Sequence, residues 1–113
     1  MMEQYNPDNF LSDKVPYLAG TETIAKSGVF LKGQIFAIKA DNKLYALDLA
    51  DKDGAAIPYF VLDNKVDATN NDVVVNGYYV GAFNKDKLLF GSNVADNVFT
   101  ACRKQNIYPV SFI

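Results

Sequence analysis

Short apolar stretches separated by polar turns run along most of the chain, which is the pattern of a mainly β protein. The clearest strand candidates, rich in β-branched and aromatic residues, are 34–38, 44–47, 57–62 and 73–80. In 34–38 and 44–47 both alternating faces are apolar, so we expect each strand to be covered on both sides. In a chain of 113 residues, this predicts a sheet curled into an incomplete barrel, with a helix or another subunit covering its outside.

Further strands are expected at 21–25, 29–31 and 107–113. Residues 41–43, with the sequence Asp-Asn-Lys, have the composition of a hairpin turn between two of the strands. The pair Asn76-Gly77 allows two interpretations. It is a strong two-residue hairpin signal when apolar strands flank it. It also fits one long strand, in which Gly77 marks a bulge or a close backbone approach.

The segment between the strands at 57–62 and 73–80 contains the stretch Val66-Asp67-Ala68-Thr69. An Asp side chain can accept a hydrogen bond from the backbone N–H two residues further on, and Thr can do so more weakly. We therefore predict that Asp67 and Thr69 form a structural turn.

A helix is predicted over 93–105. Ser92 or Asn93 can cap its amino end, and Arg103 and Lys104 fall in the last turn, where the helix dipole favours cations. The sequence therefore places one helix near the carboxyl end of an otherwise β domain.

One face of this helix is apolar. Val94, Val98, Ala101 and Cys102 recur at helical spacing, so Cys102 is expected to be a buried, unreactive thiol. Phe99 lies about 140° from Val94 around the axis. It is either the edge of a wide apolar face, which we favour, or a contact with another subunit.

Residues 1–20 keep neither helical nor strand periodicity. We interpret them as an extended N-terminal arm, disordered alone and ordered on a partner, which adds little to the core of a β domain at 21–113. A plain disordered tail is the alternative. The side chains expected to bind the partner are those of Tyr5, Pro7, Phe10, Leu11, Val15, Pro16 and Tyr17.

Composition narrows the choice of function. The formal net charge is −2, from 11 Lys and Arg against 13 Asp and Glu, so there is no electrostatic footprint for nucleic acid or for a membrane surface. The longest apolar run, 55–62, is too short to span a bilayer. The amino end lacks the pattern of a signal peptide, so we expect no export by that route.

Catalytic and metal-binding patterns are missing from the sequence. The chain has no histidine and a single cysteine, which excludes the usual nucleophile–histidine pairs, a Cys/His metal site and an intrachain disulfide. Placing Gly54 at the sixth position of a calcium loop puts Leu49 and Phe60 where carboxylates are required, so we reject a calcium site. We predict neither an enzyme nor a cofactor.

The order of landmarks over 54–91 carries a resemblance. An Asp-Gly-Ala stretch precedes an apolar strand that ends in Val-Leu; Val-Asp-Ala-Thr at 66–69 then leads to a valine-rich strand, and Gly91 precedes the helix. This order resembles the head decoration proteins of lambda-type tailed phages, over about 21–113. The family usually has a Trp-Pro pair before an alanine-rich helix, where this chain has Leu-Phe-Gly at 89–91.

The resemblance implies a fold and a role. It implies a β-clip, a bent ribbon whose ends form an incomplete barrel, and it favours one long strand through Asn76-Gly77. It also implies a homotrimer on the outer surface of the expanded capsid, at three-fold positions, that holds the major coat protein against the pressure of packaged DNA. The N-terminal segment would reach onto the coat protein, and the protein would be a virion component assembled in the host cytoplasm.

Two other classes of function remain as alternatives. A small β-barrel module could bind carbohydrate or peptide on its tyrosines, and an exposed row of tyrosines over a shallow groove would favour it. A hydrolase without histidine could use carboxylates, and a pocket lined by several of them would favour that class.

Overall fold

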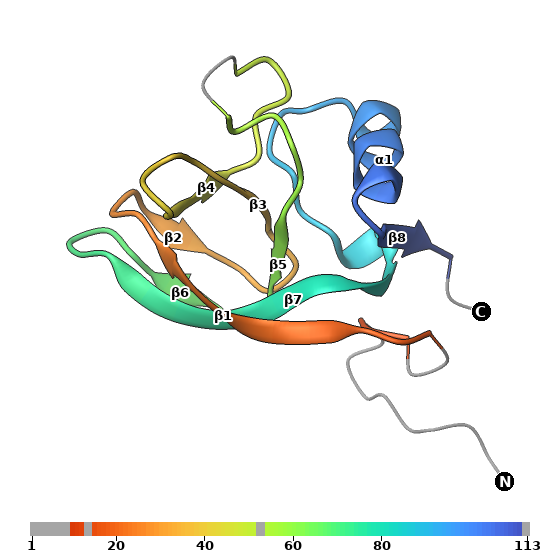
Figure 1. Cartoon of the computed structure of the whole chain (residues 1–113), viewed down its shortest axis with the longest axis horizontal. Helices are drawn as coiled ribbons and strands as arrows, with labels where there is room; N and C mark the ends of the chain where they lie inside the picture. Colours follow the sequence, from red (N-terminus) through yellow and green to blue (C-terminus); the bar gives the residue numbers. More distant parts are fainter. Residues whose placement is uncertain (1–9, 13–14, 52–53, 112–113) are drawn as a thin grey trace, which may run out of the picture.

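The computed structural model describes residues 10–12, 15–51 and 54–111 (Figure 1). These residues form a mainly β domain with one α-helix near the carboxyl end, as predicted. The elements are β1 (Leu18–Ile24), β2 (Val29–Phe30), β3 (Ile35–Ile38), β4 (Leu44–Ala46), β5 (Phe60–Leu62), β6 (Val66–Asp67), β7 (Val73–Asn84), the 3₁₀ helix η1 (Lys85–Lys87), α1 (Ala95–Lys104) and β8 (Ile107–Val110).

Six strands form a mixed sheet in the order β1-β4-β3-β5-β7-β8, and β1 also pairs with β7. The pairing therefore leads from β1 through β4, β3, β5 and β7 back to β1. The ring is weakly closed at one corner, because β1 and β4 share only the pair Ile24↔Leu44. β2 and β6 form a separate two-stranded sheet beside this ring. The predicted incomplete barrel is confirmed.

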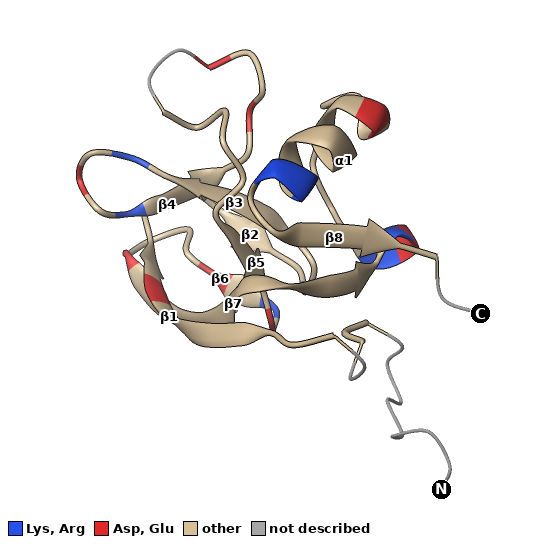
Figure 2. Ribbon diagram, turned by 45° about the vertical axis from the view of Figure 1, so that its right-hand side comes forward, with Lys and Arg blue, Asp and Glu red and all other residues tan. Residues whose placement is uncertain are grey.

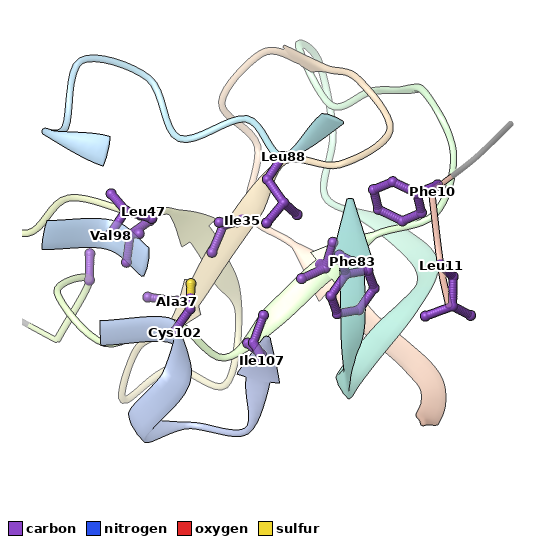
Figure 3. Close-up of a cluster of buried hydrophobic side chains, with 12 residues drawn as sticks. Phe10, Leu11, Ile35, Ala37, Leu47, Phe83, Leu88, Val98, Cys102 and Ile107 are labelled. Atoms are coloured by element: carbon purple, nitrogen blue, oxygen red, sulfur yellow. The ribbon is translucent and has the colours of Figure 1, made fainter. Parts of the chain in front are cut away.

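Two apolar clusters fill the two sides of the sheet, because side chains alternate along each strand. In β3, Phe36 belongs to one cluster and Ile35 and Ala37 belong to the other. The first cluster is enclosed by the ring, and its buried members are Ile24, Phe36, Leu44, Phe60, Leu62, Ala68 and Val75. The second contains Val98 and Cys102 of α1, which packs on the outer side of the sheet (Figure 3). The prediction of cover on both faces is confirmed for β3. It is wrong for β4, in which Leu44 is buried, Tyr45 is half-buried and Ala46 is exposed.

β7 is one long strand that runs through Gly77 without a hairpin. Gly77 pairs with Leu62 of β5. A Cβ atom there would lie 2.3 Å from the carbonyl oxygen of Val61 and 2.4 Å from the ring of Phe60. Gly77 therefore marks a close approach between strands, which is the interpretation that the resemblance favoured.

The start of α1 differs from the prediction. The helix begins at Ala95, and Val94 before it is extended and 63% exposed, so Val94 is not part of the buried face. Val94, at the N-cap position, makes no side-chain capping bond. The side chain of Asn93 instead donates to the carbonyl oxygens of Leu47 and Phe90, at 2.8 and 2.6 Å, and accepts from the N–H of Leu49. Asn93 thus ties the start of the helix to the loop after β4.

Candidate functional site

The described residues of the predicted arm begin with a short stretch that lies along β7. The N–H of Ser12 donates to the carbonyl oxygen of Ala82 at 2.9 Å, and the N–H of Asn84 donates to that of Phe10 at 2.8 Å. Between these two bonds, Leu11 pairs with Phe83 in antiparallel orientation. Residues 10–12 therefore continue, after an interruption, the antiparallel pairing of β1 with β7.

Phe10 is buried, with 2% of its surface exposed. Its ring lies 5.3 Å from that of Phe83 and 6.4 Å from that of Tyr78, measured between centroids. The ammonium group of Lys32 lies 5.1 Å from the ring centroid, which is a cation–π distance. Gly33 borders the same place, since a Cβ atom there would lie 3.4 Å from the ring of Phe10.

The expectation that the first twenty residues add little to the core is therefore wrong for Phe10 and Leu11. Both belong to the cluster that α1 covers, and Figure 3 shows them beside Phe83. β1 begins at Leu18, so the predicted boundary at Gly20 falls inside a strand. The sequence did not reveal this, because two apolar residues between polar ones show no period.

The other predicted arm residues lie in different surroundings. Tyr17 is 52% exposed, and its ring meets that of Tyr78 edge to face at 5.7 Å. Val15 is half-buried and Pro16 is exposed. Tyr5 and Pro7 lie outside the described residues.

An exposed apolar patch lies on the strands next to this segment. Leu18, 58% exposed, pairs with Val80 of β7, and Tyr108, 37% exposed, pairs with Ala82 two positions further along. Paired residues point to the same face of a sheet, and so do residues two apart on one strand. Leu18 and Tyr108 are exposed and Val80 is half-buried, and together they form a patch that offers an apolar contact surface where the N-terminal segment meets the domain.

The predicted turn at Asp67 is present. The Asp67 carboxylate accepts the N–H of Thr69 at 3.0 Å. Hydrogen bonds from the hydroxyl and then the backbone N–H of Thr69 lower the pKa of Asp67. The next residue, Ala68, is buried and exchanges backbone bonds with Ser27 and Gly28, both at 2.8 Å. The turn therefore holds β6 against the start of β2.

Phe99 is half-buried, and its ring meets that of Phe90 edge to face at 5.7 Å. It packs against the cluster that α1 covers. The structure therefore places Phe99 at the edge of the apolar face of the helix.

The tyrosines pack on one another and do not form a flat row. Tyr79 meets Tyr59 and Phe60 edge to face, at 5.4 and 5.3 Å. Both hydroxyls are engaged inside the domain, since those of Tyr79 and Tyr59 donate to one oxygen of Glu22 at 2.6 and 3.3 Å. Burial, together with the Glu22 carboxylate, raises the pKa of Tyr79 to about 12. This arrangement does not favour a tyrosine platform for carbohydrate.

The described residues offer little for chemistry. Across 10–12, 15–51 and 54–111, no three His, Cys, Asp or Glu side chains gather as a metal site would require. Burial raises the pKa of Cys102 to about 12, which keeps its thiol protonated and unreactive. In the same ranges, no helix has the length and apolar character needed to cross a membrane.

Charged side chains lie mainly on turns, with both signs side by side (Figure 2). At the turn between β3 and β4, Lys43 pairs with Asp72 at 2.7 Å, and Lys39 nearby pairs with Asp51 at 3.2 Å. On the other side of the domain, Lys32 lies 3.8 Å from Asp63. This mixing of charge fits a protein surface as a partner better than a polyanion.

The comparison with known families agrees with the resemblance noted from the sequence. The model of the family described as bacteriophage lambda head decoration protein D matches residues 1–106 of the 113. The match includes residues 1–20, which lie before the stretch that carried the resemblance. No curated protein matches the chain significantly.

Proposed function

Because the chain belongs to the family of bacteriophage lambda head decoration protein D, we propose that it attaches to the outer surface of the expanded phage head as a trimer. It sits at three-fold positions and holds the major coat protein together against the pressure of packaged DNA. The family match over residues 1–106 is the observation that carries this proposal. A protein that binds the assembled shell and not its separated subunits stabilises the shell by mass action. Three linked copies add multivalency.

The contact with the coat protein is made by the N-terminal region. Its first residues, which include Tyr5 and Pro7, add as an extended strand to an exposed edge of the coat protein, with alternate side chains in pockets. The exposed patch of Leu18, Val80 and Tyr108 lies beside this segment and contacts the same partner. The exposed part of Phe99 is available to a neighbouring subunit of the trimer.

Cosedimentation with emptied, expanded capsids of the source phage tests this function. The protein should pellet with the capsids and saturate at three copies for each three-fold position. Unexpanded capsids are the control, and they should retain much less protein. A protein that stays in the supernatant at micromolar concentration with expanded capsids is not a decoration protein for that shell.

A further inference from the structure

We propose that Phe10, Leu11 and Ser12 form an anchor that sets where the capsid-binding arm leaves the domain, so that the residues before Phe10 are the part that reaches out from the domain to the coat. This inference rests on the proposed function. It assigns to Phe10 the role of positioning the arm and not of touching the partner. It also moves the start of the domain from residue 21 to residue 10.

The first support is the place of the anchor in the sheet. Its two backbone bonds, at 2.9 and 2.8 Å, bracket the pair Leu11↔Phe83 as in a regular antiparallel ladder. On the opposite edge of the same stretch of β7, Phe83 pairs with Pro109 of β8. The anchor thus turns the end of β7 from an edge strand into a central one.

The anchor is also supported by the surroundings of the Phe10 side chain. Tyr78 and Phe83 of β7 form one wall, and Lys32 and Gly33 from the connection between β2 and β3 form another. Gly33 has φ of +96°, and a Cβ atom there would come 2.2 Å from the carbonyl oxygen of Lys87, so the wall can approach only because it is glycine. Such surroundings, built from separate parts of the chain, exist only in the folded domain.

The third support is a second contact further along the chain. Tyr17 meets Tyr78 edge to face at 5.7 Å, on the residue that also borders Phe10. Phe10 and Tyr17 therefore both contact the side chain of Tyr78. This excludes the interpretation of these two residues as free parts of the arm.

The anchor changes what the arm can reach. Tyr5 lies five residues before an anchor at Phe10, at most about 18 Å along the chain, whereas it lies fifteen residues and up to about 50 Å before residue 20. A shorter tether raises the local concentration of the attaching residues near their partner, and fewer residues must be ordered on binding. The anchor therefore strengthens attachment without contributing a contact.

Phe10→Ala tests the anchor by two measurements. Amide exchange in the free protein should show the N–H groups of Ser12 and Asn84 protected in the wild type and exposed in the variant. Attachment to expanded capsids, measured well below the melting temperature, should weaken about three- to tenfold per arm, because the tether lengthens. Phe10→Leu keeps a large apolar side chain at this place. It should restore both the protection of the two amides and the attachment to capsids.

Phe30→Ala is the matched control for lost stability. Phe30 packs edge to face on Phe36 at 4.9 Å, in the other apolar cluster. This variant should lose stability and still attach like the wild type. If Phe10→Ala does not fold, Ser12→Pro removes the bond from residue 12 to Ala82 without truncating a core side chain. In this variant the N–H of Asn84 should exchange fast, and attachment should weaken as expected for Phe10→Ala.

The outcomes separate this inference from the proposed function. If the wild type does not attach to capsids, the proposed function fails, whereas protected Ser12 and Asn84 amides still demonstrate the anchor. If the wild type attaches, and a variant that has lost the amide protection attaches with an affinity within twofold of the wild type, the anchor does not position the arm. Fast exchange of the Ser12 amide in the wild type would also overturn the proposal.

Discussion

At the scale of single residues, a glycine without a Cβ atom allows two strands to approach closely. Gly77 of β7 lies under Val61 and Phe60, where a Cβ atom would come within 2.3 and 2.4 Å of them. The nearest obstacle is a carbonyl oxygen, which cannot move without disturbing the pairing of β5 with β7. Gly28 is the opposite case, because no atom lies within 4 Å of a Cβ built there.

Gly77→Ala should therefore lower the free energy of unfolding by about 3 kcal/mol, the upper range for an overpacked core. Gly28→Ala should change it by less than about 0.5 kcal/mol. Urea denaturation of both variants measures the difference. Equal stabilities would mean that β5 and β7 are not packed as described.

The buried thiol of Cys102 offers a second test at this scale. The residue is 0% exposed, and burial raises the pKa of its thiol to about 12, so almost no thiolate is present at neutral pH. A disulfide reagent should label the native protein only after local opening and the unfolded protein within seconds. Rapid labelling of the native protein would place Cys102 outside the core.

At the scale of elements, α1 is held by one narrow face. Val98 and Cys102 are completely buried under it, whereas Val94, one turn before Val98, is 63% exposed. Asn93 adds three polar contacts that fasten the start of the helix to the loop after β4. The helix therefore depends on Val98 much more than on Val94.

Val98→Ala should lower the free energy of unfolding by about 2 kcal/mol through lost apolar burial and the cavity left behind. Val94→Ala is the matched substitution in the same element and should change it by at most about 0.5 kcal/mol. Chemical denaturation monitored by circular dichroism measures both. A large effect at Val94 would show that it is covered, for example by another subunit.

The elements that the sequence predicted are those with a strong local pattern. β3, β4 and β7 follow from runs of apolar and β-branched residues, and the turn at Asp67 follows from side-chain chemistry two residues apart. The cap at Asn93 was predicted wrongly, because its partners at Leu47 and Leu49 are distant in the sequence. The place of residues 10–12 was missed for the same reason, since their pairing with β7 spans about seventy residues.

At the scale of the whole molecule, aspartates on turns accept hydrogen bonds that exist in the folded state, and those of Asp72 connect distant segments. Asp72 accepts the side chain of Lys43 and the N–H of Lys26, and Asp41 accepts the hydroxyl of Tyr45. These hydrogen bonds lower the pKa of both carboxyls, as those from Thr69 lower the pKa of Asp67. In each case the folded state stabilises the charged form.

The lowered pKa values of these carboxyls set the direction in which the stability of the protein changes with pH. A carboxyl with a lowered pKa in the folded state contributes stability above its unfolded pKa, near 3.8 for these groups, and loses it as the pH falls through the folded pKa. The melting temperature should stay nearly constant from pH 7 to about 5 and fall below about pH 4. The melting temperature of the Asp72→Asn variant should fall less steeply below about pH 4 than that of the wild type. If the two melting temperatures fall identically with pH, Asp72 does not contribute to the loss of stability in acid.

We propose that the protein stabilises an assembled phage shell. Scanning calorimetry of emptied, expanded capsids of the source phage, with and without the protein, tests it most directly. A ligand of the assembled state raises the temperature of its transition, and the rise grows with ligand concentration above the dissociation constant. We predict a shell transition that moves to higher temperature as protein is added and levels off only slowly. A shell transition that stays at the same temperature with excess protein would contradict the account.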